Sequence, residues 1–234
     1  MNPRNFKLQC VGYDLNADFY EASEDVVLLN LIGYSSNIAK YNDFLSYLNE
    51  KNNISILTID YSGHGQSPFD LNDLTPAQNF LEVITAFDWI KYKYPNAKIY
   101  VMGASYGGFL ATQLTKYREF EKLILRVPAI YKPENFYTTW GEYEIEEGRN
   151  YRETAEKLTD HPLLKRASKF SGKTLVVTHE LDDVCPLNST MAFKEAFKAE
   201  HYEAKGFKHS FGQSDVAEDQ IQEYYKNISD WLKI

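Results

Sequence analysis

The fold of this chain is decided by the stretch Val101-Met-Gly-Ala-Ser-Tyr-Gly-Gly-Phe-Leu-Ala111. The run that leads into it, residues 98–102, is short, apolar and rich in β-branched and aromatic residues, which is typical of a buried strand. Beyond it, apolar residues recur at helical spacing over residues 106–117 without a proline, which indicates a helix. The stretch therefore predicts a strand that ends at a sharp turn carrying Ser105 and continues directly as a helix.

The centre of this turn, Gly103-Ala-Ser-Tyr-Gly107, fits the Gly-x-Ser-x-Gly pattern of a nucleophile elbow. A strand and a helix joined this tightly bring their backbones close together, so a side chain at either glycine would clash. Ser105 must adopt a strained backbone for its hydroxyl to stand clear of the sheet. The alternative for so short a motif is a glycine-rich turn that only packs tightly, and the partners of a reactive serine decide between the two.

Composition limits the class of protein. A chain of 234 residues can bury one sizeable core, and single α/β domains of this length are ordinary. The formal net charge is −8 and no basic cluster stands out, which argues against nucleic-acid binding. No apolar run approaches the roughly 20 residues that span a bilayer, and the first residues do not resemble a signal region. Cys10 and Cys185 suggest neither a disulfide framework nor a metal site, so we expect a soluble cytoplasmic protein, with a homodimer left open.

Apolar runs alternate with amphipathic segments along most of the chain, which predicts an α/β fold with a mostly parallel central sheet flanked by helices. Parallel strands are expected at residues 26–32, 54–59, 98–102, 122–127, 174–178 and 202–204. An antiparallel hairpin is expected at the sheet edge from residues 6–13 and 17–22, with its turn at 14–16. Helices are expected after a cap at Ser35 or Ser36, from a capping box at Thr75 to about residue 94, after Ser105, and over residues 215–232.

Residues 128–171 interrupt this alternation. The segment has no strand pattern, and it carries many large aromatic residues, namely Tyr131, Phe136, Tyr137, Trp140, Tyr143 and Tyr151. It also holds an acidic run made of Glu142, Glu144, Glu146 and Glu147. An aromatic insertion after a central strand predicts a short helical lid at 128–171 over a core of residues 1–127 and 172–234. The alternative is a small helical excursion whose aromatic residues only pack onto the body.

A serine hydroxyl is a weak nucleophile and needs a base, usually histidine, which an acidic residue orients. On a sheet of this type the acid and then the histidine follow the serine along the chain. His64 and His161 precede the expected acid loop, and His179 ends the strand before it. His201 is expected at the start of the next strand, far from the turn. His209 lies in a glycine-bounded loop before the last helix, and we therefore predict it as the base.

The acid is expected in the loop His179-Glu-Leu-Asp-Asp-Val-Cys-Pro186, which leaves the C-terminal end of a strand. Catalytic groups gather at such strand ends in open α/β sheets. The loop offers Glu180, Asp182 and Asp183, and position alone does not choose among them.

Together these residues resemble the α/β-hydrolase superfamily, and the likeness spans nearly the whole chain. Gly103-Ala-Ser-Tyr-Gly-Gly108 is similar to its nucleophile elbow, and Asp60-Tyr-Ser-Gly-His-Gly-Gln-Ser67 is similar to a turn that many members carry. In the family's acid loop the aspartate usually lies four positions before the proline, which selects Asp182. The chain most resembles small bacterial serine esterases with a short cap, including cinnamoyl- and acyl-ester hydrolases and monoacylglycerol-lipase-like proteins. The Gly-x-Ser-Tyr-Gly-Gly variant also recurs in serine peptidases of the prolyl-oligopeptidase type.

The resemblance implies an oxyanion hole built from backbone N–H groups. Its donors would be Tyr106, directly after the nucleophile, and Tyr34, with Ser35 as a neighbouring candidate. Many relatives have His-Gly at the second position, whereas this chain has Ile32-Gly33-Tyr34. Because only the backbone donates, the missing histidine need not abolish the hole. The resemblance also implies that His64 is a structural residue of the turn, as the histidine at this position usually is in the family.

The predicted function is hydrolysis of a carboxylic ester through an acyl-enzyme, with Ser105 as nucleophile, His209 as base and Asp182 as its orienting acid. This chemistry requires neither a metal nor an organic cofactor. The aromatic insertion favours a small-molecule ester with an apolar or aromatic acyl or alcohol group. The alternatives are a serine peptidase, aminopeptidase or amidase whose lid glutamates bind an amine, an acyl thioesterase, and a non-catalytic binding protein of the same fold.

Overall fold

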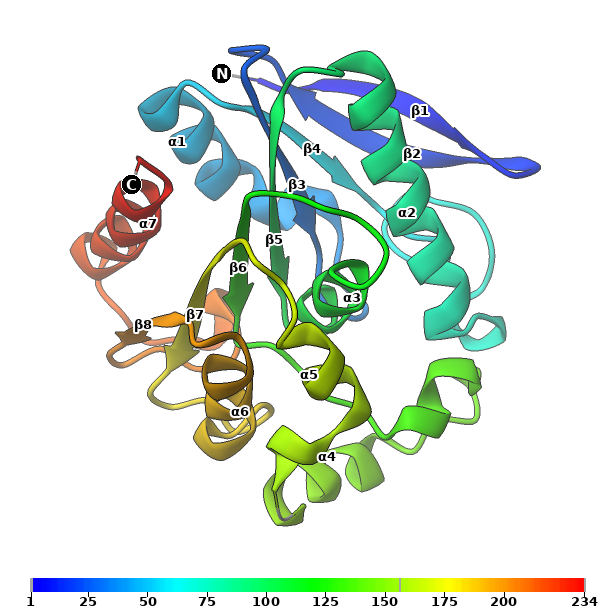
Figure 1. Ribbon diagram of the computed structural model, residues 1–234, viewed down its shortest axis with the longest axis vertical. Coiled ribbons are helices and arrows are strands. Elements are labelled where there is room, and N and C mark those ends of the chain that lie inside the picture. The colour runs from blue at the N-terminus through cyan, green and yellow to red at the C-terminus, as the bar shows by residue number, and fades with distance from the viewer. Residues whose placement is uncertain (1, 156, 234) are drawn as a thin grey trace.

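The centre of the molecule is an eight-stranded sheet (Figure 1). The computed structural model describes residues 2–155 and 157–233. The strands are β1 (Arg4–Cys10), β2 (Tyr13–Tyr20), β3 (Val26–Leu31), β4 (Ser55–Ile59), β5 (Lys98–Ala104), β6 (Lys122–Arg126), β7 (Lys173–His179) and β8 (Glu200–Ala204), in the order β1-β2-β4-β3-β5-β6-β7-β8. β2 runs antiparallel to both of its neighbours, and the other pairs are parallel. The predicted mostly parallel α/β sheet is thus confirmed.

Helices cover both faces of the sheet. The α-helices are α1 (Asn42–Asn52), α2 (Pro76–Lys93), α3 (Tyr106–Leu114), α4 (Ile145–Thr154), α5 (Pro162–Ala167), α6 (Leu187–Phe197) and α7 (Glu218–Lys233). Short 3-10 helices lie at Ile38–Tyr41, Leu71–Asp73, Pro133–Tyr137, Leu158–Asp160 and Phe211–Gln213. Helices α1 and α7 bury one face of the sheet, and α2, α3, α5 and α6 bury the other, which gives two separate apolar cores (Figure 1).

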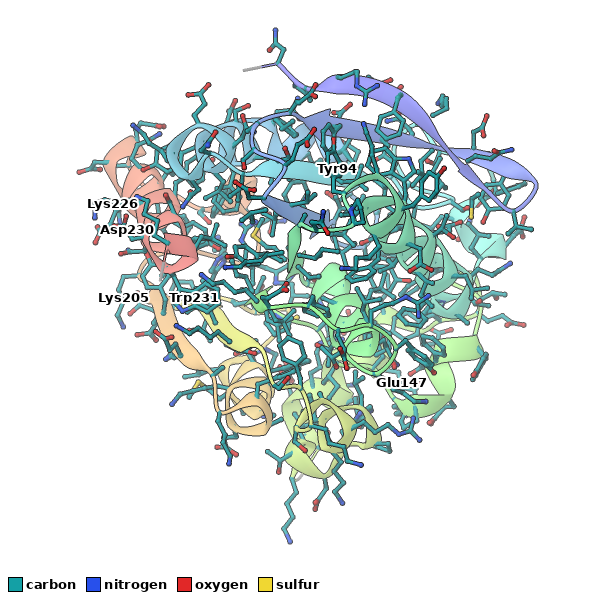
Figure 2. All side chains as sticks on the ribbon, turned by 45° about the horizontal axis from the view of Figure 1, so that its top comes forward. Tyr94, Glu147, Lys205, Lys226, Asp230 and Trp231 are labelled. Atoms are coloured by element: carbon teal, nitrogen blue, oxygen red, sulfur yellow. The ribbon has the colours of Figure 1, made fainter. Side chains whose placement is uncertain are left out.

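In the last helix, α7, the polar and apolar positions determine which side faces solvent and which side packs on the sheet. Lys226 and Asp230 pair at 2.7 Å on the outward side of α7, whereas Ile228 is buried in the core beneath it (Figure 2). A stripe of apolar residues along one side of a helix is what fixes such an orientation. Among residues 2–155 and 157–233, no helix combines the length and the apolar character needed to cross a membrane.

The chain changes its direction of travel across the sheet between β3 and β5. From β3 it passes through α1 to β4 on one side, and from β4 it returns through α2 to β5 on the other side of β3. The two crossover helices lie on opposite faces, which opens a crevice at the C-terminal ends of these strands, where ligands bind in open α/β sheets. Gly33 and Ser105 lie just beyond the two strand ends.

The N-terminal hairpin is present, but its predicted turn at residues 14–16 was wrong. Val11 and Gly12 connect β1 to β2, and residues 14–16 lie within β2, paired with residues 7–9 of β1. Gly12 has a φ of 85°, a left-handed conformation that glycine adopts at little cost. Asn16 is a typical turn residue, yet here it is buried in the strand and its amide donates to Asp60 at 2.9 Å.

Helix starts were predicted with mixed success. Thr75 caps α2 in a capping box with Gln78, as predicted. Neither Ser35 nor Ser36 caps a helix, because Asn37 accepts the backbone N–H of Lys40 and starts a 3-10 helix, after which α1 begins at residue 42. The last helix begins at residue 218, three residues later than expected.

Residues 128–171 form helices and loops, and no strand occurs among those that the structure describes. The segment contains α4 and α5, and α4 lies at the lower end of the molecule in Figure 1. Tyr131 and Trp140 are buried, whereas Tyr137 is exposed. Part of the aromatic content therefore packs the segment onto the body.

Candidate active site

The stretch at 101–111 forms the predicted strand–turn–helix. β5 ends at Ala104, α3 begins at Tyr106, and Ser105 between them has φ 53° and ψ −113°. A Cβ added to Gly103 would overlap the backbone of Gly107, and one added to Gly107 would overlap the backbone at Leu31 and Ile32. Both glycines are therefore required by the close approach of strand and helix. A strained residue of this kind persists only where its surroundings determine it, and such residues cluster at functional sites.

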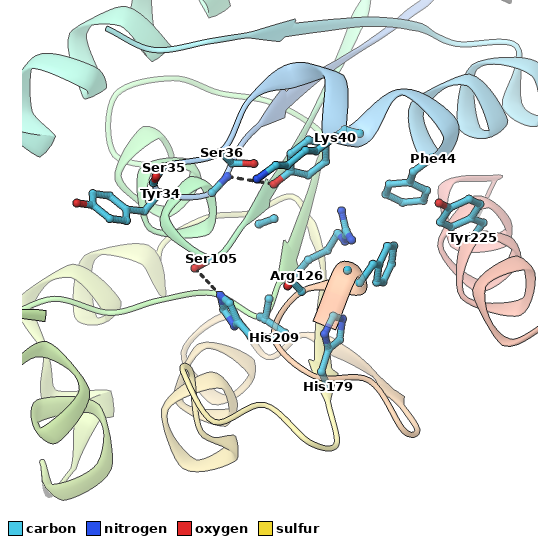
Figure 3. Close-up of a pocket in the computed structure, with 17 residues that line it drawn as sticks. Tyr34, Ser35, Ser36, Lys40, Phe44, Ser105, Arg126, His179, His209 and Tyr225 are labelled. Atoms are coloured by element: carbon cyan, nitrogen blue, oxygen red, sulfur yellow. Dashed lines mark hydrogen bonds between the residues drawn. The ribbon is translucent and has the colours of Figure 1, made fainter. Parts of the chain in front are cut away.

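The structure brings Ser105, His209 and Asp182 together as a hydrogen-bonded chain. His209 Nε2 lies 2.9 Å from Ser105 Oγ (Figure 3), and His209 Nδ1 lies 2.8 Å and 3.0 Å from the two Asp182 carboxylate oxygens. Because Nδ1 faces a carboxylate, it carries the proton and donates it. Nε2 is then free to accept the serine O–H, which is the arrangement that a serine nucleophile requires.

The acid loop holds Asp182 rigidly. Its Oδ1 accepts the backbone N–H groups of Val184 at 2.9 Å and Cys185 at 2.8 Å, and its side chain is 2% exposed. The other two candidates point elsewhere. Asp183 is exposed, and the Glu180 carboxylate accepts the backbone N–H of Gly206 at 2.8 Å.

The remaining histidines serve other contacts. The Nδ1 atom of His64 lies 3.0 Å from the Ser62 carbonyl, and the Nε2 atom of His161 lies 2.9 Å from the Tyr131 carbonyl. His201 lies in β8 and bonds to Thr178 at 2.9 Å. The Nδ1 atom of His179 lies 2.6 Å from the Lys208 carbonyl. Burial lowers the pKa of His64, His161, His179 and His201, so each favours its neutral form.

The turn after β4 shapes the loop opposite the elbow. The buried Asp60 carboxylate accepts backbone N–H groups of Ile38 at 2.8 Å and Gln66 at 3.0 Å. A Cβ on Gly65 would overlap this carboxylate, so the glycine is needed there. Asp60 thus ties the loop after β3 to the turn that the sequence motif describes.

The predicted oxyanion donors lie at this crevice. Tyr106 is the first residue of α3, where a backbone N–H has no acceptor within the helix. Within the described part of the chain, the backbone N–H groups of Tyr34 and Tyr106 donate no hydrogen bond. A Cβ built on Gly33 would stand 3.8 Å from Ser105 Cβ, so the loop that carries Tyr34 is close to the serine. The Gly33 N–H itself donates to the Tyr41 hydroxyl at 3.1 Å (Figure 3).

A cavity of about 520 Å³ opens beside Ser105 on the side of α1 and α7 (Figure 3). Its wall is formed by the loop after β3, the ends of β5 and β6, and the loop that carries His209. Three of its residues have positive φ without being glycine, namely Ser35 at 54°, Ser105 at 53° and Val127 at 43°. Such concentration of backbone strain in one wall is typical of a functional site.

A second cavity, of about 180 Å³, shares Tyr34, Ser105 and His209 with the first but opens toward residues 128–171. Aromatic side chains from that segment dominate its wall. The ring centroids of Tyr34 and Trp140 are 4.4 Å apart, and those of Trp140 and Tyr143 are 5.3 Å apart. The serine and histidine therefore stand where two cavities meet.

The charges that line these cavities are basic. Lys40 and Arg126 line the larger one, and Arg149 and Arg152 line the smaller one. Among the residues that the structure describes, no aspartate or glutamate lines either cavity. These four basic residues were not among the predicted site residues. The signal for Arg126 was a charged residue that ends the otherwise apolar run Leu123-Ile-Leu125.

The four glutamates of the insertion's acidic run line neither cavity. Glu142, Glu144, Glu146 and Glu147 are all exposed. Glu147 pairs with Lys132, and Glu146 lies 3.7 Å from Arg149. In the described ranges, no group of three or more His, Cys, Asp or Glu side chains is arranged to hold a metal ion.

Comparison with known proteins gives the family. A family model described as serine aminopeptidase, S33, matches residues 22–147, which is more than half of the chain. The chain belongs to the serine aminopeptidase S33 family. The S33 match includes Ser105 and ends before Asp182 and His209. No match was found among curated proteins.

Solved structures share the fold of this S33-family chain. An esterase from Pyrococcus furiosus has 16% identity and a TM-score of 0.73, with 99% of this chain and 91% of that chain covered. An esterase from Butyrivibrio proteoclasticus with ferulic acid bound has 19% identity and a TM-score of 0.70, covering 95% and 97%. An acylaminoacyl peptidase from Pyrococcus horikoshii has 17% identity and a TM-score of 0.72, covering 99% of this chain but 41% of that one. The chain is thus a serine hydrolase of the α/β-hydrolase fold, as the sequence predicted.

Proposed function

We propose that this protein hydrolyses carboxylic esters through an acyl-enzyme intermediate. Ser105 Oγ attacks the acyl carbon while His209 Nε2 takes the serine proton. His209 then donates that proton to the departing alkoxide, so the alcohol leaves and the acyl group stays on Ser105. Water attacks this acyl ester with His209 again as base, which releases the acid and restores the serine.

Charge develops on the carbonyl oxygen during both attacks. The backbone N–H groups of Tyr106 and Tyr34 are proposed to bind this oxyanion, since neither donates to another acceptor in the described residues. A preorganised donor of this kind contributes roughly 3 to 4 kcal/mol to transition-state stabilisation. Asp182 is proposed to orient His209 and stabilise its imidazolium form, because it is buried and itself held by two backbone N–H groups.

The observation that carries the ester proposal is the lining of the two cavities. They meet at Ser105 and His209, so one cavity can hold the acyl group and the other the alcohol. Both are largely apolar or aromatic, with basic rather than acidic polar groups. A peptidase that reads a free N-terminal amine needs an anion in its binding site, and the four glutamates of the insertion are exposed.

Residues 128–171 are proposed to act as a lid over the smaller cavity. The rings of Tyr131, Trp140 and Tyr143 line that cavity and contact one another, and Trp140 also contacts the ring of Tyr34. An apolar or aromatic group seated among these rings would be shielded from water. The esterase of the same fold that was solved with ferulic acid bound is consistent with an aromatic substrate.

The family name and the acylaminoacyl peptidase relative favour aminopeptidase activity as the second candidate. Turnover of p-nitrophenyl butyrate should therefore be compared with that of leucine p-nitroanilide, which releases the same type of chromophore from an amide. The butyryl thioester of coenzyme A tests the thioesterase alternative. We expect kcat/KM for the ester to exceed both of the others. A higher kcat/KM for the anilide would replace the ester proposal with the peptidase one, and no turnover of any of the three would indicate a binding protein.

A further inference from the structure

The larger cavity has an unpaired cation in its wall. Arg126, the last residue of β6, is only 6% exposed. In the part of the chain that the structure describes, no carboxylate lies within 4.0 Å of its guanidinium. Its Nη1 atom is buried and has no hydrogen-bond partner among the described residues. A buried charge of this kind is costly unless an opposite charge or hydrogen-bond acceptors compensate it.

Neutral groups hold the guanidinium in place. Arg126 Nε donates to the Tyr224 hydroxyl at 2.8 Å, and that hydroxyl lies 3.2 Å from His179 Nε2. The guanidinium also lies 4.6 Å from the ring centre of Phe44 and 5.3 Å from that of Phe211. These contacts fix the orientation of the side chain through Nε and its faces. They leave Nη1 without an acceptor among the described residues, and the Nη groups of a guanidinium suit the oxygens of a carboxylate.

The guanidinium of Arg126 and the Ser105 nucleophile border the same cavity. Figure 3 shows the Arg126 side chain directed into the cavity of about 520 Å³ that also borders Ser105 and His209. The backbone N–H of Ser105 donates to the Arg126 carbonyl at 2.9 Å, so Ser105, just beyond the end of β5, lies beside the end of β6. A ligand with one end at the Ser105 hydroxyl can therefore reach the guanidinium with its other end inside the same cavity.

We propose that Arg126 binds a carboxylate of the substrate, so that the preferred ester carries a carboxylate on its acyl or its alcohol part. This inference rests on the proposed ester hydrolysis, because it takes the bound molecule to be a substrate. The carboxylate site itself does not depend on turnover. The rest of the wall, with Phe44, Phe211 and Tyr225, favours an apolar or aromatic chain between the ester and the carboxylate. Lys40 at the edge of the cavity adds a second positive charge.

Matched substrate pairs test the proposal by turnover. Monomethyl adipate against methyl hexanoate places the carboxylate on the acyl side, and 4-acetoxybenzoate against 4-acetoxybenzamide places it on the alcohol side. The measured quantity is the ratio of kcat/KM for the charged substrate to that for the neutral one. In Arg126→Gln this ratio should fall roughly tenfold to a hundredfold for one of the pairs, the loss expected for a buried charged hydrogen bond. The pair that responds identifies which half of the ester occupies the cavity.

Arg166→Gln is the matched control. Arg166 is exposed in α5 and lines neither cavity, so its removal changes the net charge equally without touching the proposed site. Its ratios should equal those of the wild type. Equal ratios in Arg126→Gln and Arg166→Gln for both pairs would overturn the proposal.

A binding measurement separates this proposal from the catalytic one. Calorimetry with 4-phenylbutyrate and its neutral amide on the Ser105→Ala protein needs no turnover. The acid should bind at least about tenfold more tightly than the amide, and adding Arg126→Gln should abolish the difference. The acid-against-amide comparison on Ser105→Ala remains a test even if Arg126→Gln does not fold. Preference for the acid without any ester turnover would refute the ester proposal alone, whereas ester turnover with equal binding of acid and amide would refute the carboxylate site alone.

Discussion

The two cavities that meet at Ser105 use buried arginines in opposite ways. In the smaller cavity, Arg152 donates through Nε to the Val184 carbonyl at 2.8 Å and through Nη1 to the Ile130 carbonyl at 3.4 Å. In the larger cavity, Arg126 donates through Nε to Tyr224, and its Nη1 has no partner within residues 2–155 and 157–233. Both side chains are nearly inaccessible, at 4% and 6% exposure. Burial alone therefore does not distinguish a structural arginine from one that is available to a ligand. The two are distinguished by how many of their N–H groups already have acceptors in the protein.

The contrast has a structural consequence for the acid loop. Val184 follows Asp182 by two residues, and its own N–H is bonded to the Asp182 carboxylate. Arg152 thus links helix α4 of the insertion to the loop that holds the acid. Arg126 donates to Tyr224 of α7 and borders the larger cavity, and none of the hydrogen bonds and ring contacts of its side chain among the described residues is with the acid loop. We infer that Arg152 stabilises the wall of the smaller cavity, whereas Arg126 in the larger cavity binds a ligand.

The largest effect is expected from replacing Ser105, which borders both cavities. In Ser105→Ala, the turnover of every ester should fall by about 10⁴-fold or more, because the described part of the chain brings no other hydroxyl into a hydrogen bond with His209. Stopped assays with p-nitrophenyl butyrate measure this, and circular dichroism checks that the variant is folded. Residual turnover within tenfold of the wild type would mean that the two cavities meet at something other than the nucleophile.

Asp182→Asn should have the next largest effect. The amide preserves the shape but favours the wrong histidine tautomer, and such a change lowers kcat by about 10²- to 10⁴-fold in serine hydrolases. The effect should fall on kcat more than on KM, because Asp182 lines neither cavity. Asp183→Asn, in the same loop but exposed, is the control and should retain wild-type kcat. Equal losses in the two variants would contradict the assignment of the acid.

Replacing the two arginines separately sharpens the comparison through stability. Arg152→Met leaves buried carbonyls of Val184 and Ile130 without donors, so the free energy of unfolding should fall by about 2 to 4 kcal/mol. Arg126→Gln loses one hydrogen bond and also removes an uncompensated buried charge, so its loss should stay below about 1 kcal/mol. Urea unfolding of both variants measures the difference. A larger loss in Arg126→Gln than in Arg152→Met would reverse the roles given to them.

The smallest effect concerns His179, which lies in the wall of the larger cavity. Burial lowers the pKa of His179 to about 4 from its ordinary value of 6.5. His179 is therefore protonated below about pH 6.5 in the unfolded chain but only below about pH 4 in the folded protein. Because the unfolded state binds the extra proton, the free energy of unfolding falls as the pH drops from 6.5 to 4. Between pH 7.5 and pH 5 this histidine should cost the wild type about 2 kcal/mol of unfolding free energy.

Urea unfolding of the wild type and of His179→Gln at the two pH values checks this prediction. The other buried histidines are present in both proteins, so the difference between them isolates His179. The variant should lose about 2 kcal/mol less than the wild type on acidification. Parallel losses in the two proteins would show that His179 does not titrate as its burial requires.

The elements that the sequence predicted well are those whose pattern is local. The glycines of the elbow follow from a local steric requirement. The order of acid and histidine along the chain pointed to His209 and to the loop at 179–186, and the family resemblance selected Asp182 within that loop. The hairpin turn was misplaced because Asp14 and Asn16 are turn formers in isolation, whereas Asn16 is buried in β2 against Asp60. The cap at residues 35–36 was misplaced because Asn37 provides the side-chain oxygen instead.

The two cavities could not be predicted, because they depend on which side chains from distant segments face one another. Arg126 and Arg152 are 26 positions apart and look alike in the sequence. Their difference arises from the partners that the fold brings to each, Tyr224 from α7 for one and the Val184 carbonyl for the other. The exposed positions of the insertion's glutamates likewise depend on how residues 142–147 pack in the folded protein, which no local pattern predicts.

Labelling with a fluorophosphonate tests the central claim most directly, because the reagent reacts with a serine only where a base and an oxyanion hole activate it. Mass spectrometry of the wild-type protein should show one adduct per chain, located on the peptide that contains Ser105. Ser105→Ala should show none, and His209→Ala should label far more slowly. A wild-type protein that remains unlabelled, or that carries its adduct on another residue, would contradict the assignment of Ser105 as the nucleophile.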